Sequence, residues 1–147
     1  MKAVIQRVSG AKVEVDGSVV GSINMGLLVL LGVEKGDTAN DMVYIVKKIA
    51  QLRIFEDSAS KMNLSVKDIS GEVLVVSQFT LSADCRKGNR PSFIAAEEPD
   101  KARVMYMEVV ERLRQEGIST RAGQFASHMQ VHLINNGPVT ILLDSRK

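Results

Sequence analysis

The run GLLVLLGV at residues 26–33 constrains the fold of this chain more than any other stretch of its sequence. Its centre, Leu27 to Leu31, is entirely apolar but far shorter than the roughly 20 residues that a membrane-spanning helix needs. Successive side chains of a β-strand point to opposite faces, so a strand made only of apolar residues must be covered on both faces. We therefore expect a doubly buried strand with other layers packed against it.

Two segments have the periodicity of helices that could cover such a strand. The first follows Asp37, a residue type suited to cap a helix, and the second begins at Pro99 and Asp100 and ends at Gly117. Both repeat apolar residues at intervals of three and four, as amphipathic helices do. These apolar positions are Met42, Ile45, Val46, Ile49 and Ala50 in the first helix, and Ala102, Met105, Tyr106, Val109 and Leu113 in the second.

The other patterned segments indicate strands. Apolar and polar residues alternate in AVIQRVS and then in AKVEVDGSVVGSI, which we expect to form a hairpin through Asp16 and Gly17. Residues 73–76 form an apolar strand ending in SQFTL, and MQVHLINNGPVTILL indicates two strands joined through Gly137 and Pro138; the stretch after Leu52 is polar and turn-rich. The sequence thus predicts one α/β domain, residues 1–147, in which mixed β-sheets pack in layers with two long α-helices.

Charge and cysteine content narrow the possible classes of function. The formal net charge of the 147-residue chain is only +2, so it lacks the bulk positive charge of a protein that binds nucleic acid by electrostatics alone. Cys85 is the only cysteine, which excludes an internal disulfide and every multi-cysteine metal site. Gln6 and Arg7 stand where a secretory signal would need apolar residues. We expect a cytoplasmic protein that neither enters a membrane nor binds DNA.

The motif SQFT places two hydroxyls and an amide at the end of an apolar strand. Polar groups at a strand end commonly line a site, but Ser77 and Thr80 could equally bond their own backbone. If the strand continues through this motif, Ser77 and Phe79 face one side of the sheet, and Gln78 and Thr80 face the other. A binding site and an ordinary strand terminus are both compatible with the pattern.

A nucleophilic hydroxyl would need a base, and the only histidines are His128 and His132. Both lie in the polar register of HMQVHLI and read as exposed strand residues, so no Ser-His-Asp arrangement is predicted. The acidic residues Asp84, Glu97 and Glu98 have no paired spacing that would single out a general acid and base. Two histidines without further ligands also predict no metal site.

Two further groups of residues could contact RNA. Arg86, Lys87 and Arg90 lie on a glycine-containing loop after SQFTL, where they could hold a phosphate backbone by charge. Phe125 and Met129 offer an aromatic face and a thioether that could stack on a base. The alternatives are a solvated loop for the three cations, and core positions for the other two side chains.

The Gly137–Pro138 bond interrupts a predicted strand pair, although proline donates no hydrogen bond to a β-ladder. A cis X-Pro bond is only about 0.5–1 kcal/mol less stable than trans, and it would turn the chain sharply and fix the direction of neighbouring carbonyls. A trans bond in an ordinary loop between edge strands is the alternative, and it has the higher base rate.

SQFTL at residues 77–81 together with NNGPVT at 135–140 resembles the D-aminoacyl-tRNA deacylase family, also called D-tyrosyl-tRNA(Tyr) deacylases. The similarity covers nearly the whole chain, in order through IQRVSGAKVEVDG, GLLVLLGVEKGD, RIFEDSASKMNLSV, RPSF and MQVHLINNGPVT. The chain departs from the family pattern at Asn136, where aspartate is expected, and in FASHM, where a Gly-Ala pair is usual.

This resemblance implies a D-tyrosyl-tRNA deacylase-like fold and an enzyme that uses no metal or other cofactor. Such an enzyme cleaves the ester between a D-amino acid and the 3′-terminal ribose of tRNA, clears mischarged glycyl-tRNA and rejects L-aminoacyl-tRNA. The resemblance also implies a homodimer. In it, a cis Gly137–Pro138 from one subunit enters the active site of the other, beside the catalytic segment Ser77 to Thr80, where main-chain groups leave no room for an L side chain.

For catalysis, we expect water to attack the ester carbonyl with help from the substrate's own 2′-hydroxyl. Backbone N–H groups near Phe79 and Thr80 would polarise the carbonyl oxygen. Thr80 as the nucleophile is our second choice. Two other functions suit the same residues: a non-catalytic RNA-binding module on this scaffold, and a small-molecule esterase that needs no RNA.

Overall fold

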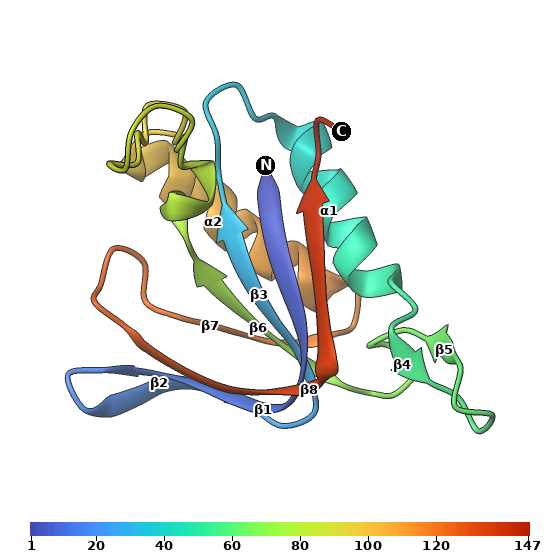
Figure 1. Ribbon diagram of the computed structural model, residues 1–147. Helices are drawn as coiled ribbons and strands as arrows, with labels where there is room; N and C mark the ends of the chain where they lie inside the picture. Colours follow the sequence, from blue (N-terminus) through green and yellow to red (C-terminus); the bar gives the residue numbers. More distant parts are fainter.

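The main sheet is built along the two edges of strand β1 (Lys2–Val15), as Figure 1 shows. On one edge, β3 (Gly26–Gly32) pairs antiparallel with the first half of β1, and β2 (Ser18–Ile23) pairs with its second half. On the other edge, β8 (Gln130–Asp144) runs antiparallel along nearly all of β1. The computed structural model describes residues 1–147. The segments AVIQRVS and AKVEV, which were expected to form two strands, both belong to β1, and its pairing with β8 shifts register between Val8 and Gly10.

Two parallel strands extend the sheet beyond β3. The strand β6 (Glu72–Ser77) pairs with β3, and β7 (Ser119–Ala122) pairs with β6, which gives the order β2-β1-β3-β6-β7 with β8 on β1. Parallel pairing requires long crossover connections. The helices α1 (Ala39–Gln51) and α2 (Pro99–Gln115) lie in these connections and pack on the same face of the sheet. The predicted α/β class, with mixed strands and two long helices, is confirmed.

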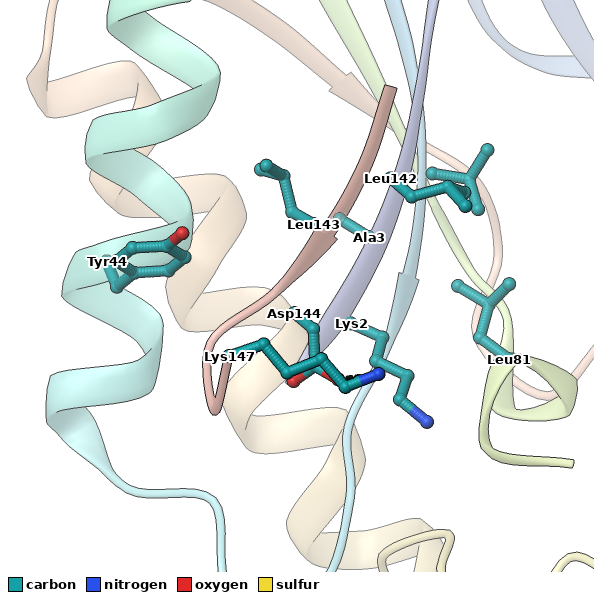
Figure 2. Close-up of a pocket in the computed structure, with 9 residues that line it drawn as sticks. Lys2, Ala3, Tyr44, Leu81, Leu142, Leu143, Asp144 and Lys147 are labelled. Carbon is teal, nitrogen blue, oxygen red and sulfur yellow. Dashed lines mark ion pairs between the residues drawn. The ribbon is translucent and has the colours of Figure 1, made fainter. Parts of the chain in front are cut away.

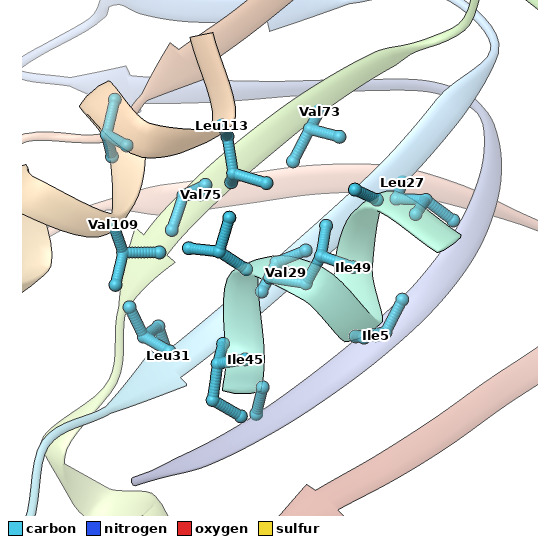
Figure 3. Close-up of a cluster of buried hydrophobic side chains, with 14 of the residues drawn as sticks. Ile5, Leu27, Val29, Leu31, Ile45, Ile49, Val73, Val75, Val109 and Leu113 are labelled. Atoms are coloured by element: carbon cyan, nitrogen blue, oxygen red, sulfur yellow. The ribbon is translucent and has the colours of Figure 1, made fainter. Parts of the chain in front are cut away.

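Strand β3 is buried on both faces, as its sequence predicted. Leu27, Val29 and Leu31 point to the helices and belong to a core cluster that Figure 3 shows. Leu28 points the other way, into a second cluster with Val8 and other residues of β1, β2 and β6. The second half of β1, β2 and the start of β8 close over that face, because the long β1 changes partners from β3 to β2. A curled sheet thus supplies the second covering layer.

The predicted helices form, and only one boundary signal was wrong. All five predicted apolar positions of α1 are buried, and α2 begins at Pro99 and buries Met105, Tyr106, Val109 and Leu113. The N-cap of α1 is Thr38, not Asp37, because the Asp37 carboxylate is engaged by other donors. Neither helix combines the length and apolar character that crossing a membrane requires.

The polar stretch after Leu52 contains a small hairpin that the sequence pattern did not reveal. It consists of β4 (Phe55–Glu56) and β5 (Met62–Leu64), which pair with each other apart from the main sheet. Strands of two and three residues are too short to show a period-2 pattern. The hairpin is anchored because Ile54, Phe55 and Val66 are buried in the large core. At the hairpin that the sequence did predict, Asp16 and Gly17 have positive φ values of 50° and 79°, as expected of that turn.

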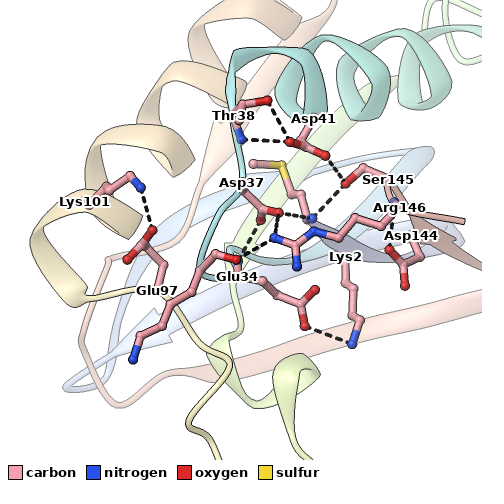
Figure 4. Close-up of polar contacts among 12 residues, drawn as sticks. Lys2, Glu34, Asp37, Thr38, Asp41, Glu97, Lys101, Asp144, Ser145 and Arg146 are labelled. Carbon is pink, nitrogen blue, oxygen red and sulfur yellow. Dashed lines mark hydrogen bonds and ion pairs between the residues drawn. The ribbon is translucent and has the colours of Figure 1, made fainter.

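Asp37 is the centre of a buried polar cluster that ties together three distant parts of the chain (Figure 4). Its Oδ1 atom accepts hydrogen bonds from the Met1 amino group at 2.6 Å and from Arg146 Nη2 at 2.7 Å, and its Oδ2 atom accepts from the Glu34 N–H at 2.7 Å. The Met1 amino group also donates to Ser145 Oγ at 2.8 Å. These contacts neutralise a carboxylate that would be costly to bury alone.

Acid should destabilise the fold through the neighbouring carboxylate of Asp41. A hydrogen bond from Ser145 Oγ at 2.6 Å is the main cause that lowers the pKa of Asp41 to about 2, and donation from the Thr38 N–H at 2.7 Å adds to it. A lowered folded-state pKa stabilises the protein above the unfolded value, near 4, and this stabilisation is lost as the pH falls towards 2. Urea unfolding of the wild type and Asp41→Ala should therefore differ most at pH 7 and converge between pH 4 and pH 2. An equal difference at both extremes would contradict this role.

Candidate active site

The motif SQFT ends strand β6 and begins a short 3-10 helix, η1 (Phe79–Ser82). Gln78 still continues the hydrogen bonding between β6 and β3, since its N–H donates to Leu31 O at 2.8 Å. The next carbonyl along β3 that could accept from this segment is Val33 O, but it accepts from the N–H of Glu97 instead. The chain therefore turns, so the strand does not continue through the motif and the alternation expected of a continuing strand does not arise. A 3-10 helix repeats every three residues, and here both Phe79 and Thr80 are exposed.

This turn leaves two main-chain donors without partners. The hydrogen bonds of η1 begin with the Leu81 N–H, which donates to Gln78 O at 3.2 Å. The N–H groups of Phe79 and Thr80 precede that bond and donate to no acceptor in the chain, as is usual for the first donors of a helix. The motif thus offers two adjacent N–H groups to whatever binds beside it.

The pocket next to this turn has a volume of about 590 Å³ and is formed by four segments of the chain. It brings together three of the four predicted catalytic residues with both predicted base-stacking residues. Its walls are the end of β6, the start of α2, the loop before β8 and β8 itself. The lining residues are Val76, Ser77, Gln78, Phe79, Ala96, Glu97, Pro99, Ala102, Phe125, Ala126, Ser127, His128, Met129 and Val131.

Phe125 and Met129 pack on the core and also line the pocket. Of the two predicted roles, a surface for a stacked base and a core position, neither alone describes them fully. Both are half-buried. The Phe125 ring lies 5.8 Å from the ring of Tyr106, whose hydroxyl donates to Val75 O at 2.9 Å and whose pKa is raised to about 12 by burial. Met129 packs on the second core cluster, and a Cβ at Gly123 would lie only 2.9 Å from its sulfur. These contacts fix both side chains while leaving their other surfaces to the pocket.

Two ionisable side chains in the pocket were not predicted as site residues. Glu97 is 8% exposed and accepts a hydrogen bond from Lys101 Nζ at 2.7 Å, which is the main cause that lowers the pKa of Glu97 (Figure 4). His128 is exposed, just before β8, and His132 lies exposed on β8 itself. Spacing gave no signal for Glu97, because the pocket is formed by segments far apart in the sequence.

Thr80 has no base beside it. Its Oγ1 accepts a short hydrogen bond from the side-chain amide of Gln78, and no histidine or carboxylate bonds to it. His128 Nε2 lies 3.4 Å from Gln130 Nε2, and His132 lies 3.4 Å from Glu14. No group of three or more His, Cys, Asp or Glu side chains is close enough to hold a metal ion. The chemistry available at the motif is therefore that of amides, hydroxyls and main-chain donors.

The segment Asn136–Val139 bulges out of β8. Asn135 pairs with Val8 and Thr140 pairs with Gln6, so four residues of β8 stand opposite the single residue Arg7. One strand with a bulge thus replaces the two strands expected around the Gly-Pro. The bond Gly137–Pro138 is cis, and Gly137 has a φ of 141°, a conformation that side chains of L-residues rarely adopt. Neither residue lines the pocket beside SQFT in its own chain.

Arg7 holds the base of this bulge. It is only 7% exposed, and it donates to two main-chain carbonyls: Nε to Asn136 O at 2.9 Å, and Nη1 to Ile54 O at 2.8 Å. No carboxylate lies within ion-pair distance of its guanidinium. Asn135 also supports the bulge, since its Oδ1 accepts from the Val139 N–H at 3.1 Å. The Gly-Pro segment is therefore fixed from both of its ends.

A second hollow, of about 440 Å³, lies along β1 and the end of β8, between η1 and α1 (Figure 2). Leu81, the last residue of SQFTL, and Leu142 of β8 face it from one side, and Tyr44 of α1 borders the other. Leu142 is 76% exposed, and Ile134, before the bulge on the same strand, is 67% exposed. Exposed apolar side chains thus flank the Gly-Pro segment on both sides along β8.

Fold and site together define a single-domain α/β protein with a pocket at a strand end, where an amide, a hydroxyl and unpartnered main-chain donors lie beside the side chains of Glu97 and His128. The chain belongs to the family whose model is described as D-Tyr-tRNA(Tyr) deacylase, which matches residues 4–144. This confirms the family resemblance of the two motifs.

Named relatives are similar in sequence to this chain over nearly its full length. It is 59% identical to a D-aminoacyl-tRNA deacylase from Thermotoga petrophila, covering 100% of this chain and 99% of the relative, and 58% identical to one from Geobacter sulfurreducens, covering 99% and 96%. Among solved structures it is similar to a protein described as c-Myc DNA Unwinding Element Binding Protein, with 42% identity, a TM-score of 0.93 and 98% of both chains covered. A probable eukaryotic D-amino acid tRNA deacylase, 14% identical with a TM-score of 0.80 and 97% of both chains covered, shares the fold.

Proposed function

We propose that this protein is a proofreading hydrolase that cleaves the ester of D-aminoacyl-tRNA, and of mischarged glycyl-tRNA, to free amino acid and tRNA in the cytoplasm. The observation that carries the proposal is the pocket beside SQFT in a chain of the D-Tyr-tRNA(Tyr) deacylase family. Its volume of about 590 Å³ lies within the range of roughly 300–1,000 Å³ for small-ligand sites.

The terminal adenosine of the tRNA fits the aromatic and thioether end of this pocket. Phe125 and Met129 present fixed apolar surfaces on which a base can stack, and stacking accepts a nucleobase without reading its sequence. Ser77 and Gln78 line the same pocket, where the ribose and its ester would follow. No cofactor is needed for this reaction, because ester hydrolysis requires only water and stabilisation of the oxyanion.

Hydrolysis would depend on main-chain groups and on the substrate itself. The unpartnered N–H groups of Phe79 and Thr80 are suited to stabilise the oxyanion that forms when water adds to the ester carbonyl. The 2′-hydroxyl beside the ester assists the attacking water. The Thr80 hydroxyl, engaged by the Gln78 amide and remote from any base, is the less favoured nucleophile.

The Gly137–Pro138 segment would act as the chirality filter of a partner subunit in a homodimer. Three observations support this placement: the segment bulges from its strand, it lies outside the pocket of its own chain, and exposed Ile134 and Leu142 flank it. Large exposed apolar side chains beside a rigid projection are typical of a subunit contact.

A main-chain wall explains how one site can accept many D-amino acids. A pocket that discriminates by the fit of one small group gains only about 1–3 kcal/mol, or roughly 10- to 200-fold. A wall that excludes every L side chain by collision does not depend on which side chain is present. Such a wall must be rigid, and Arg7 provides this rigidity from within β1.

Replacing Arg7 by methionine should reduce both stability and discrimination. The carbonyls of Ile54 and Asn136 would lose charged donors, so the free energy of unfolding in urea should fall by about 3 kcal/mol. The ratio of kcat/KM for D- over L-tyrosyl-tRNA should fall at least about tenfold as the wall loosens. A matched control is Leu113→Ala in the core, expected to cost about 2–5 kcal/mol. The Leu113→Ala variant should leave the D/L ratio of kcat/KM unchanged. An equal loss of discrimination in that variant would show that Arg7 affects discrimination only through overall stability.

The direct test of the function is incubation of the purified protein with D- and L-tyrosyl-tRNA, with release of tyrosine as the measurement. We expect rapid release from the D-ester only. Release from neither would favour the second candidate, a non-catalytic RNA-binding module, for which the pocket and the basic loop after η1 are equally suited. Hydrolysis of simple esters without RNA would instead indicate a small-molecule esterase.

One solved relative is described as a DNA-binding protein, and a duplex DNA competitor in the same assay would test that property here.

A further inference from the structure

The loop after η1 is closed at its base and attached to the pocket. Asp84 and Ser92 pair through two main-chain hydrogen bonds, of 2.8 and 3.0 Å, so residues 85–91 form a closed loop. Directly after this pair, the ring of Phe93 packs edge-on against Phe79, with 5.2 Å between ring centroids. Because Phe79 lines the pocket, the position of the loop is tied to the position of the site.

The three cations of this loop are not equivalent. Arg86 is bound within the loop: Nε donates to Asp84 Oδ1 at 2.9 Å, Nη2 donates to Oδ2 at 2.5 Å, and its own main-chain N–H donates to Oδ1 at 3.0 Å. These contacts hold the pKa of Asp84 well below its usual range and raise that of Arg86. Lys87 and Arg90 are exposed, and neither has a carboxylate within 4.0 Å. The loop thus presents two free positive charges on a backbone that the third keeps in place.

We propose that Lys87 and Arg90 bind phosphates of the RNA strand that leads away from the pocket, while Arg86 maintains the shape of the loop. The inference rests on the proposed function, which places the ester on the 3′-terminal ribose beside the N–H groups of Phe79 and Thr80. Guanidinium and ammonium groups are the usual protein ligands of phosphate. With a net charge of only +2, the chain cannot attract RNA by bulk charge, so affinity must come from local cations placed beside the path of the strand.

The chain contains a matched control for these charges. Lys47, Lys48 and Arg53 are also exposed and form no ion pair, although Lys48 Nζ lies 5.6 Å from the centroid of the Tyr44 ring; all three border another hollow at the C-terminal end of α1. Figure 1 shows α1 and the loop after η1 on opposite sides of the molecule. Removing two lysines there changes the net charge by the same amount as removing Lys87 and Arg90. Any difference between the two double variants therefore reports on position and not on total charge.

The test is the salt dependence of binding to tRNA that carries no amino acid, so the measurement does not require hydrolysis. Each phosphate neutralised on a single strand contributes a slope of about −0.7 in log K against log salt, so the double variant Lys87→Ala, Arg90→Ala should reduce the slope by about 1.4 and weaken binding about tenfold or more at low salt. The double variant Lys47→Ala, Lys48→Ala should leave the slope unchanged. An unchanged slope in the loop double variant, or an equal change in the α1 variant, overturns the proposal.

Hydrolysis of D-tyrosyl-adenosine, which contains no phosphate, separates phosphate binding from an effect on the pocket. The Lys87→Ala, Arg90→Ala variant should hydrolyse this small ester as the wild type does, while its kcat/KM on D-tyrosyl-tRNA falls with the loss of binding. Equal losses on both esters would show that the loop shapes the pocket and would overturn the proposal. Failure of the wild type to hydrolyse either ester would instead reject the proposed function, and the tRNA-binding slopes would still decide the role of the loop.

Discussion

A D-aminoacyl-tRNA whose terminal adenosine lacks the 2′-hydroxyl should be hydrolysed about 10²–10⁴-fold more slowly than the normal ester, the range typical of a lost acid–base group. The physical reason is that no histidine or carboxylate bonds to Thr80, and the carboxylate in the pocket, Glu97, is bound by Lys101. Single-turnover rates with 2′-deoxy and normal substrates, at saturating enzyme, give the effect on the chemical step. Binding of the two tRNAs should be similar, because one hydroxyl contributes little to a contact made by base and phosphates.

The matching protein variant is Thr80→Ala, which should retain hydrolysis within about tenfold of the wild type. The Thr80 hydroxyl accepts a hydrogen bond from the Gln78 side-chain amide, so removal of the hydroxyl should affect the orientation of Gln78 more than the chemical step. A loss greater than about 10³-fold with tRNA binding retained would identify Thr80 as the nucleophile, since removing a covalent nucleophile has effects of that size or larger. Normal turnover of the 2′-deoxy ester would rule out assistance by the 2′-hydroxyl.

Substitution of Gly137 by alanine should reduce hydrolysis of D-tyrosyl-tRNA by about 100-fold, the scale on which a displacement of about 1 Å affects a positioned site. A Cβ on Gly137 would lie 2.8 Å from Val139 Cγ2 and 3.1 Å from Arg7 Nη2, and the φ of 141° disfavours any side chain. The wall must therefore move. Asn136→Asp is the control, because Arg7 binds the main-chain oxygen of Asn136 and that variant leaves the contact intact.

Mixed dimers test whether this wall acts across subunits. Subunits carrying Gly137→Ala can be combined with subunits inactivated at Gln78, which lines the pocket. If each pocket uses the wall of its partner, the mixed dimer contains one pocket with intact Gln78 and an intact Gly137, and activity returns. If each pocket uses its own wall, both pockets of the mixed dimer are defective and no activity returns. A strictly monomeric protein that still discriminates D- from L-esters would also rule out the cross-subunit arrangement.

Much of the fold follows from local pattern. The apolar run around Val29 required burial on two faces, and the structure provides it with helices on one side and the curled sheet on the other. The spacing of apolar residues located α1 and α2 nearly to the residue. The hairpin β4–β5 was missed because its strands are shorter than the repeat that identifies a strand. Asp37 has the chemistry of a helix cap, but the long-range partners Met1 and Arg146 engage it instead.

The sequence by itself determined the layers, the helices and the family, because periodicity and contiguous motifs are local properties that one segment can display. Only the tertiary structure decided which residues share a pocket: it joined Gln78 to Phe125, Met129 and the unanticipated Glu97, and it excluded Gly137 from the pocket of its own chain. It also turned SQFT into a 3-10 helix, because Val33 bonds to Glu97 and leaves the strand without its next acceptor. Such outcomes depend on which distant groups compete for the same hydrogen bonds, and no spacing along one chain records that competition.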